Sequence, residues 1–405
     1  MSLFAAIRMP REVVFGAGQR HCLGTIARRF GTRALVCTDA RLAGEAIFLE
    51  MIVELEAAGL TVQVDSSVLP DVPRDSCISS AEAARAFAPD LVIGIGGGSC
   101  LDLAKCVALL LAHGGSPEDY YGEFKVPGPT LPIIAVPTTA GTGSEVTPVA
   151  VLSDPDRTMK VGISSPYLIP QAAICDPELT LTCPPGLTAI AGADALTHAI
   201  DAFLAIRREP TSSLSQKRVF VGKNALGDHF ALLAIGLLAK SLERSFLDGS
   251  DINARADVML GASAAGMAFG TAGTALAHAI QYPLGADTHT AHGLGVACLL
   301  PYVMTYNRAV GMLELAAIGR AMGVAGNSDA ELADAAISRV AELFAAIGIP
   351  ADLNALGMDE ARIDWTATQA LTIGRLVDNN PRPIDAAGMN RLVHAAFAGD
   401  RALAL

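Results

Sequence analysis

Residues 90–105 read Asp90-Leu-Val-Ile-Gly-Ile-Gly-Gly-Gly-Ser-Cys-Leu-Asp-Leu-Ala-Lys105, and this stretch decides the fold of the first half of the chain. It begins as an apolar segment of strand length, breaks at three consecutive glycines and resumes with apolar residues at helical spacing. Such a turn brings backbone N–H groups close to a phosphate, because glycine has no Cβ and a helix N-terminus carries a positive dipole end. An ordinary tight turn is the alternative. We expect the phosphates of a dinucleotide to bind here, at Gly96, Gly97, Gly98, Ser99 and, in the first helical turns, Asp102.

Strand-like and helix-like segments alternate through the first half of the chain. We expect strands at 32–39, 61–65 and 131–137, and helices at 42–59 and 81–88. This alternation predicts a parallel, doubly wound α/β sheet. From Pro184 onward the strand signals fade, and an alanine-rich helical periodicity continues to the C-terminus. We therefore expect an α/β dinucleotide-binding domain in residues 1–184 and an all-helical domain in residues 185–405.

Length and composition bound the class of protein. The 405 residues are too many for one ordinary domain, and 51% of them are hydrophobic, so the chain can bury a large core. The mean hydropathy is +0.41, but no uncharged apolar run has the length of a membrane span, and residues 1–10 do not read as a secretory signal. A net charge of −12 argues against a nucleic-acid partner. The eight cysteines form no CxxC pair, which favours reduced thiols and a cytoplasmic location.

A second loop with ligand-binding character follows the strand expected at 131–137. It reads Thr138-Thr-Ala-Gly-Thr-Gly-Ser-Glu-Val-Thr147, so small hydroxyl side chains alternate with glycines. Such a loop can approach a ligand closely while it donates hydrogen bonds. We expect it to form a second wall of the cofactor site. Lys160 is either solvated or turned toward a ribose or phosphate, and the basic segment Ile206–Asn224 is either a flap or plain solvated surface.

Asp39 stands at the end of the strand expected at 32–39. At that place in a parallel sheet, a carboxylate can accept a hydrogen bond from a ribose 2′-hydroxyl and repel a 2′-phosphate. It can equally cap the helix that follows, since Asp is a common N-cap residue. Position alone leaves both interpretations open.

Histidines and one aspartate suggest a metal site in the second half of the chain. Asp194 and His198 are four residues apart in a helical pattern, so both lie on one side of the helix. Later come His278 and the pair His289 and His292, each among small residues. Three imidazoles and one carboxylate suit Fe²⁺ or Zn²⁺, whereas capping or core histidines are the alternative. A metal acting as Lewis acid, combined with a nicotinamide that takes or gives hydride, would complete a redox site.

Several motifs in order resemble the iron-containing (group III) alcohol dehydrogenase family, over nearly the whole chain. Residues 96–105 are similar to the family's diphosphate loop, and residues 137–145 to its second signature. The Asp194-to-His198 helix, His278 and His292-Gly293 match its metal-binding motifs, and Asn380-Pro-Arg-Pro383 matches a C-terminal motif. The resemblance implies a Rossmann-like N-terminal domain and an all-helical C-terminal domain, the dehydroquinate-synthase-like fold. It also implies Fe²⁺ as the usual metal, and dimers or larger homo-oligomers.

The resemblance assigns roles to individual residues. It places Asp194, His198, His278 and His292 on the family's four metal ligands. It places Asp39 where the family reads the 2′-hydroxyl, which favours NAD over NADP. Its other cofactor contacts fall on Thr138, Thr139, Thr142 and Lys160, and Val149 lies where the nicotinamide is expected.

One departure concerns the proton relay. Many family members carry a second histidine four residues after the third metal ligand, and here that position is Tyr282. A tyrosine with a pKa near 10 is a poorer base at neutral pH. Tyr282, His289 and bulk water are therefore the candidates for moving the proton of the alcohol.

We predict a metal-dependent, NAD-linked oxidoreductase that interconverts an alcohol with an aldehyde or ketone by hydride transfer. A maleylacetate-reductase-like enzyme for an acidic substrate is the first alternative, although the intact ligand set argues against it. A catalytically silent binding or assembly protein on the same fold is the alternative of another class.

Overall fold

The computed structural model describes residues 3–405, which divide into two compact units. The α/β unit comprises Arg8–Thr182 together with Gln216–Val219. The helical unit comprises Cys183–Ser215, Phe220–Leu405 and residues 3–7. Within the α/β unit, the backbone amide of Val219 donates to Glu123 at 2.6 Å and its carbonyl accepts from Arg8 at 2.7 Å. Four residues of the basic segment Ile206–Asn224 thus belong to the α/β unit, although the rest of the chain after Thr182 belongs to the helical unit.

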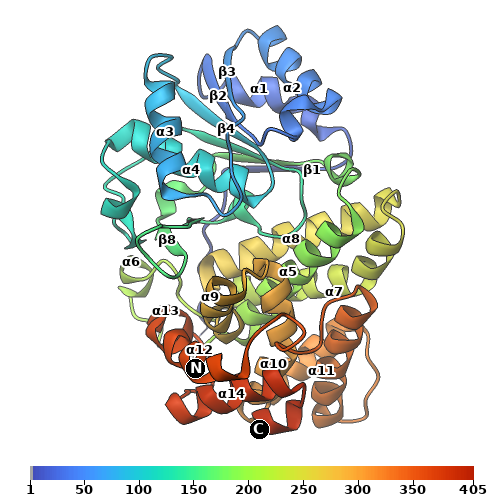
Figure 1. Cartoon of the computed structure of the whole chain (residues 1–405). Coiled ribbons are helices and arrows are strands. Elements are labelled where there is room, and N and C mark those ends of the chain that lie inside the picture. The colour runs from blue at the N-terminus through green and yellow to red at the C-terminus, as the bar shows by residue number, and fades with distance from the viewer. Residues whose placement is uncertain (1–2) are drawn as a thin grey trace. The chain divides into compact units, whose positions relative to one another are not determined.

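The α/β unit is built on a six-stranded sheet with the order β1-β9-β6-β4-β2-β3, in which every neighbouring pair is parallel. Figure 1 labels β1, β2, β3 and β4 of this sheet. Its strands are β1 (Glu12–Phe15), β2 (Arg33–Cys37), β3 (Thr61–Asp65), β4 (Leu91–Gly96), β6 (Ile133–Pro137) and β9 (Ala172–Cys175). A second, three-stranded sheet contains β5 (Gly122–Glu123), β7 (Val149–Leu152) and β8 (Val161–Ser164). The predicted parallel α/β architecture of this half is confirmed.

Helices bury both faces of the large sheet. On one side, Ala34 and Val36 of β2 share a core with α1 (Leu23–Ala27) and α2 (Ala46–Ala57). The alternate residues Leu35 and Cys37 share a second core with α3 (Arg74–Arg85) and α4 (Gly98–His113). Because successive strand residues point to opposite faces, a strand covered on both faces is apolar throughout. This explains the uninterrupted apolar run that precedes the three glycines.

The strand order puts the two predicted cofactor loops side by side, at the carboxyl ends of the neighbouring strands β4 and β6. From β2 the chain passes outward to β3, then returns to β4 on the other side of β2 and continues to β6. The reversal between β2 and β4 is a topological switch point, and ligands of such sheets bind outside the carboxyl ends of the strands there. The residues at these ends are Asp39 after β2, the glycine turn after β4 and Thr138 after β6.

The helical unit packs long helices around α5 (Pro185–Leu204), which contacts α7, α8 and α10. The other long helices are α7 (Ala225–Leu247), α8 (Ile252–Ala272), α9 (Leu276–Thr288), α10 (His292–Met322) and α11 (Asp329–Ala346). Shorter ones are α12 (Ile363–Thr372), α13 (Gly374–Val377) and α14 (Ala386–Ala398). The predicted helical character of this half is confirmed.

Two of these helices, α5 and α7, are long and apolar enough to cross a membrane by length and composition alone. Of the most apolar stretch of α5, 83% is buried inside the protein, whereas 44% of the corresponding stretch of α7 is buried. Helix α5 also carries Asp194 and Asp201. Its apolar composition is accounted for by the helices that surround it in this unit.

The structure corrects two predicted helices and adds a helical turn to one predicted loop. The helix expected at 42–59 is interrupted at Glu45, where the backbone is extended between a 3₁₀ turn and α2. The helix expected at 81–88 begins earlier, at Arg74, directly after Pro73. The segment Ile206–Asn224 is largely irregular, as expected, but contains the single helical turn α6 (Leu214–Lys217).

A buried ion pair on α4 connects the helix to the second loop. The ammonium of Lys105, whose side chain is 0% exposed, donates to the carbonyls of Thr147 at 3.0 Å and Val149 at 2.8 Å. Asp102, whose Oδ1 is 4.0 Å from Lys105 Nζ, accepts from the Ser144 hydroxyl at 2.6 Å and the Val151 amide at 3.0 Å. Burial lowers the pKa of Lys105 to about 8, and Asp102 opposes that shift. The pair fixes the C-terminal end of the loop, and the strand that follows it, relative to α4.

The substitution Lys105→Met tests this role. We expect the free energy of unfolding to fall by about 3 kcal/mol, because the change leaves buried carbonyls and the Asp102 carboxylate without their cation. Urea denaturation followed by circular dichroism measures the loss. The matched control is Lys240→Met, whose side chain is 65% exposed and paired with Asp257, and which should change stability little. Equal unfolding midpoints for both variants would contradict the assignment.

Candidate active site

The glycine turn and the threonine-rich loop lie directly against each other. Strands β4 and β6, which precede them, are neighbours in the sheet. A Cβ atom at Gly98 would lie 2.6 Å from Thr142 Cγ2, and one at Gly97 would lie 3.5 Å from Thr139 Cγ2. The two loops that the sequence predicted for one cofactor are therefore adjacent, with backbone N–H groups at the start of α4 beside several small hydroxyl groups.

Gly96 shows why a glycine is required in this turn. Its φ is +148°, and a Cβ there would lie 2.4 Å from the Sγ of Cys100. Its carbonyl accepts the backbone N–H of Thr138 at 3.0 Å, which joins the two loops through the main chain. A larger residue would displace either the first turn of α4 or the start of the second loop.

Asp39 uses one oxygen for a local contact. Its Oδ1 accepts the backbone N–H of Leu42 at 2.9 Å, at the start of the 3₁₀ turn Leu42–Gly44, while its Oδ2 lies 3.8 Å from Cys100 Sγ. The structure thus contains the capping interaction. Since a carboxylate offers about four acceptor positions and the side chain is only partly buried, a further hydrogen bond from a ligand is compatible with it.

Other predicted cofactor residues have contacts within the α/β unit. Lys160 Nζ lies 2.5 Å from Asp71 Oδ1, and the lysine side chain is 28% exposed. The carbonyl of Val149 accepts a hydrogen bond from Lys105, and Asp102 binds the second loop as described above. Ser99 lies partly buried in the first turn of α4. Asp102 therefore contributes to the predicted cofactor site by holding the second loop in place.

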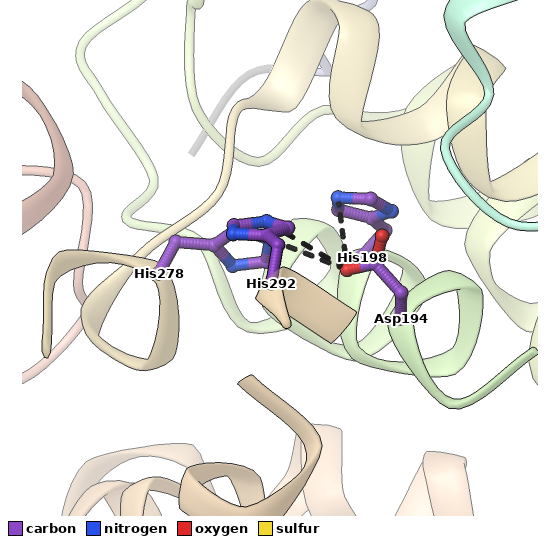
Figure 2. Close-up of side chains that lie close together, drawn as sticks. All are labelled: Asp194, His198, His278 and His292. Atoms are coloured by element: carbon purple, nitrogen blue, oxygen red, sulfur yellow. Dashed lines mark ion pairs between the residues drawn. The ribbon is translucent and has the colours of Figure 1, made fainter. Parts of the chain in front are cut away.

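The four predicted metal ligands meet in the helical unit. Asp194 and His198 come from α5, His278 from α9 and His292 from the first residue of α10. The Nε2 atoms of His198, His278 and His292 lie 3.6, 4.0 and 3.9 Å from Asp194 Oδ1. Figure 2 shows the four side chains pointing toward one another, with the three ion pairs meeting at the carboxylate. One donor atom from each lies within 4.8 Å of all the others.

This donor set fits a divalent first-row metal ion. Donors about 2.1 Å from a tetrahedral ion lie roughly 3.4 Å apart, slightly closer than the separations found here. Asp194, His198 and His278 are almost fully buried, and His292 is 29% exposed in its side chain. Among the described residues, His278 Nε2, which faces the other donors, is a buried nitrogen without a hydrogen-bond partner. Buried polar atoms of this kind require an explanation, and an ion among these nitrogen and oxygen donors provides one.

Close helix packing brings His292 to the other donors. A Cβ at the next residue, Gly293, would lie 2.5 Å from the carbonyl oxygen of Ile190 and 3.0 Å from Asp194 Cβ. Only glycine allows the start of α10 to approach α5 so closely. His278 arrives differently, through a 100° bend between α8 and α9.

Asp201 is a functional candidate that the sequence analysis missed. Its Oδ2 lies 2.8 Å from His278 Nδ1 and accepts the backbone N–H of Ala275 at 2.9 Å. Burial, together with His198, lowers the pKa of His278 to about 3, so its ring is neutral. With the proton on Nδ1 facing Asp201, the Nε2 lone pair faces the other donors. The signal in the sequence was spacing, because Asp201 follows His198 by three residues on the same side of α5.

The surroundings of the cluster are aromatic. The ring of Phe269 stacks on His198 with a centroid distance of 4.2 Å, and the Tyr282 ring lies 6.1 Å from that of His292. His289 instead ends α9 in a left-handed conformation with φ 56° and is exposed, outside the group of four donors. Of the two predicted proton carriers, Tyr282 thus borders the cluster.

Family models match both halves of the chain. Residues 10–177 match the model described as iron-containing alcohol dehydrogenase, and residues 188–397 match that of the C-terminal domain of the same family. The chain belongs to the iron-containing alcohol dehydrogenase family. The resemblance inferred from the motifs is confirmed, and with it an oxidoreductase that acts on alcohols or aldehydes with NAD(P) and an Asp/His metal site.

Individual members of the family are similar over almost the full length. Long-chain-alcohol dehydrogenase 1 of Geobacillus thermodenitrificans is 38% identical, covering 92% of this chain and 91% of that protein. NAD-dependent methanol dehydrogenase of Bacillus methanolicus is 32% identical, covering 92% and 95%. A crystal structure of 1,3-propanediol oxidoreductase superimposes with a TM-score of 0.90 at 31% identity, covering 97% of this chain and 100% of that one.

Substitution of Asp201 tests its role toward the metal-binding histidine. We expect Asp201→Ala to weaken Zn²⁺ binding about 10- to 100-fold, because His278 loses the partner that sets its tautomer and orientation. Asp201→Asn, which can still accept a hydrogen bond, should fall between this variant and the wild type. Competition with a chromophoric chelator measures the affinity.

The control for this experiment is Asp257→Ala, which removes another aspartate of the helical unit that bonds to Lys240 and Ser241. It should bind Zn²⁺ like the wild type. Unchanged affinity in Asp201→Ala would show that the carboxylate does not support the site.

Proposed function

We propose that the protein is an NAD-dependent alcohol dehydrogenase or aldehyde reductase that holds Fe²⁺ between Asp194, His198, His278 and His292. The observation that carries this proposal is the approach of three imidazole nitrogens to one buried carboxylate oxygen. The same donors suit Zn²⁺, and the description of the family as iron-containing favours iron.

The residues around the donors have separate tasks in the proposed reaction. A bound divalent ion supplies Lewis acidity to the substrate oxygen. Asp201 fixes the orientation and tautomer of His278, which burial keeps neutral, and the ring of Phe269 beside His198 excludes water. Tyr282, next to His292, is our first candidate to move the proton of the substrate hydroxyl. With an ordinary pKa near 10 a tyrosine is protonated at neutral pH, which suits proton donation during aldehyde reduction. His289 is the second candidate.

The cofactor in this proposal is NAD, bound by the α/β unit, while the helical unit binds the metal and the substrate. The diphosphate lies against the N–H groups of the glycine turn, and the ribose 2′-hydroxyl donates to Asp39. The similar methanol dehydrogenase of Bacillus methanolicus is named NAD-dependent, which supports this choice. The proposed cofactor residues are Asp39, Gly96, Gly97, Gly98, Ser99, Asp102, Thr138, Thr139, Thr142, Val149 and Lys160.

Location, assembly and substrate size are proposed from composition, from the resemblance to the family and from the surroundings of the cluster. The eight cysteines form no disulfide within the described residues, which fits the reducing cytoplasm. A homodimer or larger homo-oligomer is proposed from the resemblance to the family. A small or medium-sized alcohol or aldehyde is the proposed substrate, since Phe269 gives the cluster an apolar neighbour.

Elemental analysis with an activity assay tests the metal and the reaction together. We expect about one iron or zinc per chain after anaerobic purification, and NADH oxidation with members of an aldehyde panel. His278→Ala should lose at least about a hundredfold in kcat/KM together with the metal, because one of four ligands is gone. The exposed His394→Ala on α14 serves as the control and should keep both. Full activity without metal, unaffected by His278→Ala, would instead support the maleylacetate-reductase-like alternative.

Two variants of Asp39 separate its capping role from cofactor selection. Asp39→Asn retains an oxygen for the Leu42 amide but removes the negative charge, so the ratio of kcat/KM for NADPH to that for NADH should rise about tenfold or more. Asp39→Ala removes both functions and should also lower the thermal midpoint. Cofactor preference unchanged in both variants would leave Asp39 as a cap only.

A further inference from the structure

The bend between α8 and α9 leaves backbone groups without helical partners. Helix α8 ends at Ala272, α9 begins at Leu276, and their axes differ in direction by 100°. Gly273 between them has a φ of +85°. At such a break the last carbonyls and first amides of the helices need other partners when they are buried. The bend matters for the site because Phe269 precedes it and His278 follows it.

Two buried side chains from distant parts of the sequence bind these backbone groups. Asp201 of α5 accepts the amide of Ala275, as described above. Asn379 donates through Nδ2 to the carbonyl of Ala272 at 3.0 Å and to that of Thr274 at 3.2 Å. Asn379 is 3% exposed. It lies after α13, directly before the Asn380-Pro-Arg-Pro383 motif. This motif has no role in the reaction proposed above.

The segment that carries Asn379 is itself anchored to the helices of the site. Asn380 and Asn307 of α10 exchange side-chain hydrogen bonds of 2.8 and 2.7 Å. Arg382 donates to the carbonyl of Tyr306 on the same helix at 2.7 Å. The carbonyl of Asn379 accepts the amide of Ile206, just after α5, at 2.8 Å. Asn379 is thereby fixed relative to both α5 and α10, the helices that supply three of the four donors.

We propose that Asn379 is a positioning residue of the metal centre, which holds the α8–α9 bend at the angle that brings His278 to the other three ligands. The Asn380-Pro-Arg-Pro383 motif fixes Asn379 against α10. Asp201 and Asn379 together bind three backbone groups of the bend, so neither alone determines its geometry. This inference rests on the proposed metal site and adds to it a residue that contacts none of the ligands.

Ion binding by the full-length chain tests the proposal. Protein stripped with a chelator is titrated with Zn²⁺ in competition with a chromophoric chelator, and with Co²⁺ by visible absorption, which reports ligand geometry. Asn379→Ala removes both hydrogen bonds to the bend and should weaken Zn²⁺ binding about tenfold and change the Co²⁺ spectrum. Asn379→Ser keeps one donor and should fall between this variant and the wild type; it is also the variant to use if Asn379→Ala does not fold.

The matched control is Asn224→Ala. Asn224 is also buried, at 1% exposure, but its side chain caps α7 at the amide of Gly227 and bonds to Gly222. This variant should lose thermal stability and keep the wild-type affinity and Co²⁺ spectrum. A purely structural role for Asn379 would make its variants behave like this control, and that result would overturn the proposal. If the wild type binds neither ion, the metal site itself fails, which separates the two failures.

Discussion

The approach of three histidine nitrogens to one oxygen of Asp194 is the constraint on which the helical unit depends. Donor atoms buried this close together lose their hydration, so the arrangement is stable only with a cation among them or with strong support from the surrounding helices. The support is visible in the structure. Gly293 lets α10 approach α5, the α8–α9 bend delivers His278, and Asp201 fixes that ring. The fold thus provides the donors in advance, and the ion completes them.

In the α/β unit, the constraint is where a ligand can bind on a sheet that is covered on both faces. Its parallel sheet is covered on both faces, so no strand surface remains for a ligand, and binding groups have to lie where strands end. The second of the loops at that end is joined to α4 by Lys105 and Asp102. A fully buried ammonium is unfavourable unless several acceptors surround it, and here the acceptors are the carbonyl of Thr147, in the loop that has to be placed, and that of Val149, just after it. The hydrogen bonds that stabilise the buried charge of Lys105 therefore also hold the end of the second loop in place.

The sequence predicted what depends on local patterns, and it missed what depends on packing between distant residues. The apolar run before Gly96 implied a buried strand, and the spacing of Asp194 and His198 implied one side of a helix. Asp201 lies on the same side of that helix but looked like an ordinary helical aspartate, because its partners at Ala275 and His278 lie more than 70 residues away in the chain. Asn379 left no local signal for the same reason. His289 shares its neighbours in sequence with His292, but the left-handed end of α9 turns the chain between them, so His289 lies outside the group of four donors.

The short segment Gln216–Val219 gives the molecule an interlaced connectivity. The chain passes from one unit to the other after Ile7, Thr182, Ser215 and Val219, so neither unit is a single continuous piece. A recombination event that joined two relatives near residue 184 would combine the body of one α/β unit with a stretch inherited from the other parent, including the residue that bonds to Glu123 and Arg8. The two units are therefore inherited most safely as one block, although each has its own core.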